Sequence, residues 1–265
     1  MDNKTQAAEE GETVTILEAI EISIGYRGHQ VIENASLKLD QGQFVSLIGP
    51  NGAGKTTLLN ALGGQLRIQT GDIQFEGKSI ANWSADRRAR AGIGRSFQAV
   101  HLFPNLTTEQ NIQLAVQAKR RLRLHHLLGK VDQEVTAATR QILNEIGLLH
   151  VARVAAKALS HGDKRKLELA MLLSLQPRVL LLDEPTAGMS MTETPMMLKL
   201  IAQLKATGHY AILLVEHKID MVMQLSDRIV VLHQGHILAQ GTPSEVMNDQ
   251  EVTNAYLGGH YEGIT

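Results

Sequence analysis

The sequence predicts an α/β fold with a β-rich N-terminal part and a helical segment inserted ahead of the final strands. Three observations support this fold class. A glycine-rich stretch at residues 49–57 lies between a strand pattern and a helix pattern. Residues 107–175 show helical periodicity. From residue 178 onward, apolar strands and helix patterns alternate, as they do around a mainly parallel sheet.

The N-terminal part is expected to consist of strands and turns. Residues 13–26 and 30–40 are rich in β-branched side chains, and a Gln-Gly turn separates the second run from a further strand at 43–49. Residues 71–80 predict a short hairpin. The polar, acidic start at residues 1–13 predicts a flexible tail, so that one domain is expected over residues 14–265.

The helical insert is expected at about residues 99–175, and Thr107 begins a Thr-x-x-Gln capping box at its first helix. The elements expected beyond the insert are a strand at 178–184, a helix at 192–208, a strand at 210–217, a helix at 218–226 and a strand at 228–235. A Thr-x-x-Glu cap at Thr242, with proline at the first helical position, predicts two short helices at the end of the chain.

Composition narrows the possible functions. The 265 residues carry a net charge of -1, which provides no overall electrostatic attraction for nucleic acid. The chain has no cysteine, which excludes disulfides, thiolate metal sites and a cysteine nucleophile and suits a reducing compartment. No apolar stretch reaches the roughly 18 residues that cross a bilayer, and the start lacks a secretory signal. A cytoplasmic protein is therefore expected.

The glycine-rich stretch "GPNGAGKTT" matches the phosphate-binding pattern G-x-x-x-x-G-K-[ST] between a strand and a helix. Glycines allow its backbone N–H groups to point inward, and the helix N-terminus favours an anion. Lys55 is expected to reach the β- and γ-phosphates, Thr56 to coordinate Mg²⁺, and Thr57 to cap the helix or contact the α-phosphate. The residues expected to contact nucleotide are Gly49, Asn51, Gly52, Ala53, Gly54, Lys55, Thr56 and Thr57. The alternative is a glycine-rich turn with an incidental lysine.

A pair of carboxylates, Asp183 and Glu184, ends the apolar strand "VLLLDEP". Charges at the end of a buried strand are costly unless they meet a cation or take part in catalysis. Asp183 is expected to hold Mg²⁺ through water, and Glu184 to polarise a water for attack on the γ-phosphate. The alternative is an acidic pair that caps a helix.

A second anion site is expected in "LSHGD". Ser160 occupies the N-cap position of an apolar helix, and Gly162 permits close approach to its first turn. The alternative is an ordinary capped helix with Asp163 completing a capping box.

With "LSHGD" preceding "LLLDEP", nearly the whole chain resembles the ATP-binding cassette (ABC) family of ATPases, whose signature Leu-Ser-x-Gly helix precedes an Asp-Glu-Pro strand. The resemblance implies a P-loop NTPase core with an N-terminal antiparallel β subdomain and an inserted α-helical subdomain. It also implies that Ser160 and Gly162 contact the γ-phosphate of ATP bound to Lys55 of a second subunit. A homodimer or a heterodimer of cassettes is therefore expected.

Three further roles follow from this resemblance. Tyr26 in "SIGYRG" matches the aromatic residue that stacks on adenine, with a strand-edge tyrosine as the alternative. Gln98 in "GRSFQ" matches the glutamine that contacts Mg²⁺ and the attacking water, with a polar loop residue as the alternative. His217 in "VEHK" matches the histidine that bonds the γ-phosphate, with a structural histidine as the alternative.

The sequence departs from the common family pattern at Asp163, where glutamine is usual, and at Ser190, where aspartate is usual. Ser190 can donate a hydrogen bond across a dimer, but it cannot supply a negative charge. Communication between the two nucleotide sites is therefore expected to differ from the family pattern.

The C-terminal sequence is similar to cassette subunits of bacterial importers for branched-chain amino acids, and to their relatives for urea or short amides. The resemblance implies membrane permease partners, an indirect periplasmic solute-binding protein and a peripheral position on the cytoplasmic face of the inner membrane. No nucleic acid partner is expected. A P-loop kinase or GTPase leaves "LSHG" unexplained, whereas DNA repair or translation relatives usually carry a long coiled coil or two cassettes.

The loop after Gln98 is expected to meet a permease helix. Its apolar residues are Val100, Leu102, Phe103 and Leu106, which could instead pack into the insert's own core. The basic run at 119–130 is expected to be solvated, and its adjacent His125 and His126 make a poor metal pair.

Overall fold

The computed structural model describes residues 14–26, 28–96, 102–119 and 133–257. Several expectations lie outside these residues. They concern the N-terminal tail, Gln98, Val100, and His125 and His126 in the basic run.

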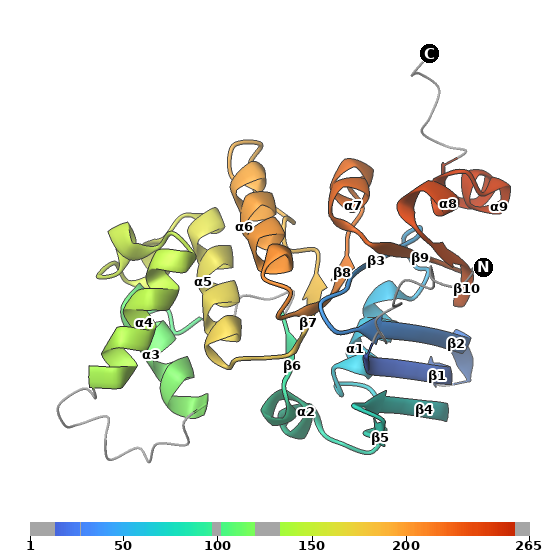
Figure 1. Ribbon diagram of the computed structural model, residues 1–265, viewed down its shortest axis with the longest axis horizontal. Coiled ribbons are helices and arrows are strands. Elements are labelled where there is room, and N and C mark those ends of the chain that lie inside the picture. Colours follow the sequence, from blue (N-terminus) through green and yellow to red (C-terminus); the bar gives the residue numbers. More distant parts are fainter. Residues whose placement is uncertain (1–13, 27, 97–101, 120–132, 258–265) are drawn as a thin grey trace, which may run out of the picture.

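One of the two sheets formed by the described residues is antiparallel and comes from the N-terminal part. Its strand order is β2 (His29–Asp40), β1 (Thr15–Tyr26), β4 (Thr70–Phe75) and β5 (Lys78–Ser79). All three strand pairs are antiparallel. The expected strands and hairpin are confirmed, and Figure 1 shows this sheet at one side of the molecule beside α1.

The second sheet combines the early strand β3 with the strands that follow β5 in the chain. Its order is β10 (His236–Gly241), β9 (Arg228–His233), β3 (Phe44–Ile48), β8 (Ala211–Val215), β7 (Val179–Asp183) and β6 (Ile93–Arg95). Only β10 runs antiparallel to its neighbour. Because the other strands are parallel, their carboxyl ends lie along one edge of the sheet, where α/β proteins bind ligands.

Alternation along the buried strands divides the interior between the two faces of this sheet. In β7, Val179 and Leu181 belong to a core shared with α1 (Lys55–Leu62) and the antiparallel sheet. Leu180 and Leu182 belong to a core shared with helices. This division follows from the two-residue period of a strand, because successive side chains point to opposite faces. Both faces of the strand are therefore covered.

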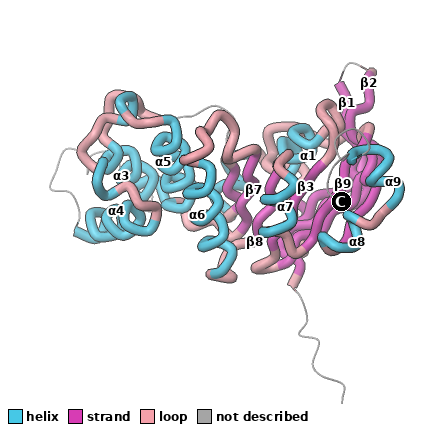
Figure 2. The backbone as a smooth tube through the Cα atoms, turned by 90° about the horizontal axis from the view of Figure 1, so that it is seen from above, coloured by secondary structure: helices cyan, strands magenta, loops and turns pink. Residues whose placement is uncertain are grey.

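The later helices cover that second face, whereas the first two helices of the insert pack against its third helix and lie farther from the strands (Figure 2). In chain order, the helices of the insert and the later helices are α3 (Thr108–Lys119), α4 (Gln133–Glu145), α5 (His161–Ser174), α6 (Thr194–Ala206) and α7 (Ile219–Leu225). The expected capping box of α3 is present, because Thr107 and Gln110 exchange hydrogen bonds of 2.9 and 3.2 Å. Short 3-10 turns at Leu149–Val151 and Ala156–Ala158 join α4 to α5.

The end of the described chain folds against β9 and β10. It contains α8 (Pro243–Met247), α9 (Gln250–Val252) and a π turn at Thr253–Leu257. The expected cap is confirmed, because the Thr242 side chain accepts from the Glu245 N–H while the Glu245 carboxylate accepts from the Thr242 N–H. Within the described residues, no helix combines the length and the hydropathy that a membrane span requires.

Three of the described strands and α-helices were not expected from the sequence: the short helix α2 (Ala85–Ala91), strand β6, which follows it, and strand β10 near the end of the chain. The helix has recognisable end signals, namely Ser84 as N-cap and Gly92 in the left-handed region at its end. The buried Arg88 guanidinium donates to the Ala61, Leu62, Ile80 and Ala81 carbonyls. It thereby ties α2 to the end of α1.

Candidate active site

The predicted site residues gather where parallel strands end. The loop after β3 contains residues 49–54, β7 ends at Asp183, and β8 leads directly into Glu216 and His217. Since β3, β8 and β7 are neighbours in the sheet, their loops meet at its carboxyl edge. The fold thus brings together motifs that are far apart in the sequence.

The glycine-rich loop has a backbone that depends on glycine at two positions in particular. Gly49 has φ 148°, and a Cβ placed there would lie 2.0 Å from the Leu232 carbonyl oxygen. Gly54 has φ 105°, and a Cβ there would lie 2.6 Å from Ile32 Cδ1. Both positions combine left-handed backbone with close neighbours, so a side chain would distort the loop at its entry and exit.

Lys55 lies inside the loop with only 6% of its surface exposed. Its Nζ donates to the carbonyl oxygens of Gly49 and Pro50 at 2.8 and 2.9 Å. Burial lowers the pKa of Lys55, whereas the nearby carboxylates of Glu184 and Asp183 act in the opposite direction. The ammonium group is therefore held at the loop opening by neutral carbonyls, which leaves its charge available to an anion.

A cavity of about 220 Å³ lies over this loop. Its lining residues are Val31, Asn51, Gly52, Gly54, Lys55, Thr56, Thr57, Glu184 and His217. The structure therefore places the phosphate-loop residues, Glu184 and His217 around one space. Tyr26 pairs through its backbone with His29 at the end of β1, and its side chain lies outside the described part of the structure.

Asp183 is almost completely buried and forms an ion pair with Arg95, whose Nη2 lies 3.6 Å from Oδ2 of the carboxylate. Neither carboxylate oxygen has a hydrogen-bond partner among the described residues. Burial raises the pKa of Asp183, and the positive charge of Arg95 opposes this effect. Buried carboxylate oxygens without a hydrogen-bond donor match the preference of Mg²⁺ for oxygen ligands and their bound waters, so the residues fit the expected metal.

Glu184 stands at the rim of the cavity with a left-handed backbone, φ 46°. The Nε2 atom of His217 lies 2.7 Å from its Oε1 atom. A non-glycine residue with positive φ is uncommon and is often associated with functional sites. Here it turns Glu184 away from the direction of the buried strand, so that its carboxylate meets the histidine at the nucleotide cavity.

A residue that sequence reasoning missed supports this pair. Glu216 is 3% exposed, and its Oε1 accepts a hydrogen bond of 2.6 Å from Thr186 Oγ1. Its Oε2 accepts from the His217 N–H at 3.0 Å. Glu216 therefore joins the loop after the carboxylate pair to the loop that carries His217. A buried acid directly after an apolar strand was the available signal in the sequence.

The predicted N-cap at Ser160 is present, because its Oγ accepts from the Asp163 N–H at 3.1 Å. The Gly162 N–H donates to Glu193 Oε1 at 2.9 Å instead of pointing freely outward. A Cβ on Gly162 would lie 2.5 Å from the same oxygen, so the close approach comes from a side chain and not from backbone. Ser190 also donates to Glu193 within the chain, through its N–H at 3.0 Å and its Oγ at 2.9 Å.

The signature helix α5 and the phosphate-loop helix α1 lie on different sides of the molecule. In Figures 1 and 2, α6 and the strands β7 and β8 lie between them. Ser160, the N-cap of α5, is not among the residues that line the cavity around Lys55 of its own chain.

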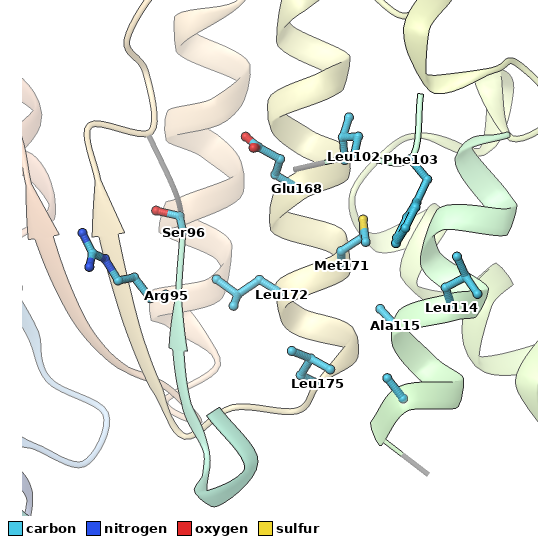
Figure 3. Close-up of a pocket in the computed structure, with 11 residues that line it drawn as sticks. Arg95, Ser96, Leu102, Phe103, Leu114, Ala115, Glu168, Met171, Leu172 and Leu175 are labelled. Atoms are coloured by element: carbon cyan, nitrogen blue, oxygen red, sulfur yellow. The ribbon is translucent and has the colours of Figure 1, made fainter. Parts of the chain in front are cut away.

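An apolar cavity of about 460 Å³ adjoins the end of β6. Figure 3 shows Leu102, Phe103, Met171 and Leu172 around it, with side chains from α3 closing one wall. Phe103 is 50% exposed, whereas Leu102 is half-buried against the helical core. In the loop after Gln98, Leu102 therefore packs against the core of the insert, whereas Phe103 is exposed.

Comparison with known families agrees with the fold and the motifs. Residues 32–187 match the ABC transporter family, and residues 236–262 match the branched-chain amino acid ATP-binding cassette transporter family. The first match covers more than half of the chain.

The names of proteins that are similar to this chain describe ATP-binding proteins of transport or export systems. The chain is 37% identical to BraF of Pseudomonas aeruginosa, a high-affinity branched-chain amino acid transport ATP-binding protein, over 92% of this chain and 98% of BraF. It is 38% identical to LivG of Escherichia coli K12, of the same description, over 88% and 94% of the two chains. LptB of Haemophilus influenzae, a lipopolysaccharide export system ATP-binding protein, is 30% identical over 94% and 100%.

Solved structures confirm the architecture. The ADP conformation of an ATP-binding cassette of an ABC transporter has a TM-score of 0.80 at 28% identity, over 93% of this chain and all of that one. A nucleotide-free ATP-binding cassette from an ABC transporter has a TM-score of 0.79 at 27% identity, with coverage of 91% and 98%.

Proposed function

The chain belongs to the ABC transporter family of ATPases, and we propose that it is the energy-supplying subunit of a solute importer. Two cassettes enclose MgATP between them, their closure drives a membrane permease, and hydrolysis reopens the pair. The solute class that the relatives favour is branched-chain amino acids, with urea or short amides as the alternatives. The 37–38% identities to branched-chain amino acid proteins exceed the 30% identity to the lipopolysaccharide export protein. The family match at residues 236–262 favours the same branch.

One observation carries the proposal: the cavity that unites Lys55, Glu184 and His217 excludes the signature helix of the same chain. In this proposal, a second cassette supplies Ser160 and Gly162 to the γ-phosphate. The second cassette is a copy of this chain or a paralogous subunit.

The residues that line the cavity have roles that their positions support, whereas the roles of Gln98 and Tyr26 rest on the family resemblance alone. Lys55 binds the β- and γ-phosphates, with the backbone N–H groups of the loop around them. Glu184 orients the attacking water and accepts its proton, while His217 bonds the γ-phosphate. Thr56, Gln98 and, through water, Asp183 would hold Mg²⁺, which would neutralise charge on the β- and γ-phosphates. Tyr26 stacks on the adenine ring.

The apolar cavity beside β6 is the proposed docking site for a permease helix. Phe103 is half-exposed at its rim, and its walls are apolar side chains from α3 and α5. A helix with an apolar face would cover these side chains and remove them from water. This contact places the subunit at the cytoplasmic face of the inner membrane. A periplasmic solute-binding protein then acts only indirectly, through the permease.

Subunit mixing tests the composite site directly. Lys55→Ala removes nucleotide binding from a chain's own cavity, and Ser160→Phe blocks its signature helix. Each variant alone is expected to lose most ATPase activity. A mixture is expected to recover part of it, because heterodimers contain one cavity with both an intact Lys55 and an intact Ser160. No recovery, with heterodimers detected by differential tags, would contradict the trans arrangement.

The solute is tested by uptake. Cells of the source organism that lack this chain are complemented with wild type or with Lys55→Ala, and uptake of labelled leucine, urea and acetamide is compared. We expect the wild-type chain to restore uptake of one of these solutes, and we expect Lys55→Ala to restore none of them.

A further inference from the structure

Arg95 connects three parts of the molecule at the end of β6. Its Nη2 lies 3.6 Å from Asp183 Oδ2. Its Nη1 donates to Asn60 Oδ1 on α1 and to Gln65 Oε1, the latter at 2.9 Å. The guanidinium therefore links the end of β7 to the helix that begins at the phosphate loop.

The position of Asp183 depends on residues 95 and 96. The side chains of Arg95 and Asp183 are 8% and 0% exposed, and the two carboxylate oxygens have no hydrogen-bond donor among the described residues. The backbone N–H of Asp183 donates to Ser96 Oγ at 3.0 Å. Adjacent residues of one strand end thus hold both the backbone and the carboxylate of Asp183.

The same two residues form a wall of the apolar cavity. Figure 3 shows the backbone of Arg95 and Ser96 facing Leu172 across the cavity, while the guanidinium and the hydroxyl point to the opposite side. Among the described strands, β6 pairs with β7 alone, so Arg95 and Ser96 stand at the edge of the sheet.

We propose that Arg95 is a positioning residue for the magnesium side of the site. Arg95 holds Oδ2 of Asp183 and leaves Oδ1, which has no hydrogen-bond donor among the described residues, available to a water that Mg²⁺ would bind. Lys55 also attracts the Asp183 carboxylate, so without the guanidinium the carboxylate would turn toward Lys55. This role rests on the proposed function, because it presupposes MgATP in the cavity.

A purely structural ion pair makes a different prediction from a positioning residue. Loss of a structural pair would weaken ATP binding equally with and without magnesium. Loss of a positioning residue would reduce the gain in ATP affinity that Mg²⁺ produces. The decisive quantity is therefore the ratio of the dissociation constants for ATP in EDTA and in excess Mg²⁺.

The test measures this ratio by calorimetry for wild type, Arg95→Met and Arg95→Lys. Arg95→Met is expected to lower the ratio about tenfold, equivalent to ~1.4 kcal/mol. The ratio for Arg95→Lys is expected to lie between those of wild type and Arg95→Met, because lysine keeps the charge but lacks the planar guanidinium group. Arg90→Met is the control, since Arg90 is an exposed arginine on the preceding helix and its ion-pair partner is the exposed Asp86.

A double variant protects the test against simple misfolding. In an Asp183→Asn background, Arg95→Met is expected to change the ratio no further, because the two residues act through one contact. Equal loss of affinity in both conditions, or an increased ratio, would overturn the role of Arg95. Wild type that binds no ATP would overturn the proposed function itself, which keeps the two failures distinguishable.

Discussion

His217 Nε2 contacts Glu184 Oε1 at 2.7 Å, across the ends of the neighbouring strands β8 and β7. The side chains are 38% and 31% exposed, so the pair stands at the surface of the nucleotide cavity. The contact fixes the direction of the carboxylate that is proposed to orient water. The imidazole, at the same time, is placed to exchange this partner for a phosphate oxygen.

Glu184→Gln is expected to keep MgATP binding but to lower turnover by about 100-fold or more, because an amide cannot accept the proton of the attacking water. Slow hydrolysis should also trap the closed dimer in the presence of MgATP. Steady-state ATPase rates and analytical ultracentrifugation measure the two effects. Glu33→Gln is a matched control, since Glu33 lies 3.5 Å from His236 on an exposed face. Unchanged turnover in Glu184→Gln would remove Glu184 from its proposed role.

Thr186→Val is expected to destabilise the protein by about 1.5–3 kcal/mol, because it removes the donor from the buried Glu216 carboxylate without changing side-chain volume much. The loop that carries residue 186 should also move relative to His217, and this movement is expected to lower ATP turnover. Chemical denaturation and ATPase rates provide the measurements. Thr192→Val, at an exposed neighbouring position, should change stability by less than about 0.5 kcal/mol. Equal stability of the two variants would contradict this account.

Glu193→Gln is expected to affect stability in a pH-dependent way. Hydrogen bonds from the backbone and side chain of Ser190 and from the Gly162 N–H hold the pKa of Glu193 below its ordinary value of 4.5. A lowered folded-state pKa stabilises the protein above pH 4.5, and this contribution disappears as the pH falls through the folded-state value.

The difference in unfolding midpoint between wild type and Glu193→Gln should therefore shrink as the pH is lowered from about 7 toward about 3.5. Asp163→Asn is the control, because it removes a carboxylate from the same helix end without removing the acceptor of the Gly162 N–H. A difference that stays constant over the whole pH range would show that the charge of Glu193 does not act through these hydrogen bonds.

Arg88→Met is expected to lower stability by about 2–4 kcal/mol, since it leaves several backbone carbonyls at the end of α1 without their donor. Burial lowers the pKa of Arg88 to about 10, so the group remains charged at neutral pH. Chemical denaturation measures the loss. The exposed Arg90→Met should change stability by less than about 0.5 kcal/mol, and a similar small effect at Arg88 would contradict the buried clamp.

The sequence by itself determined the local features of this protein. Residues 49–57 identified the phosphate loop because its chemistry requires glycine, lysine and threonine at fixed spacing. Apolar periods identified most strands and helices, and Ser160 and Thr242 marked helix starts that the structure confirms. The short strand β6 escaped because three residues contain too little periodicity to detect.

Only the tertiary structure decided which distant residues meet. The contacts of Arg95 with Asp183, of Thr186 with Glu216 and of Glu193 with Gly162 join separate loops. Sheet order and helix packing set these distances, and a local pattern contains no information about either. The sequence could therefore identify the chemical groups of the site, whereas the fold determined which of them are buried, paired or left available to a ligand.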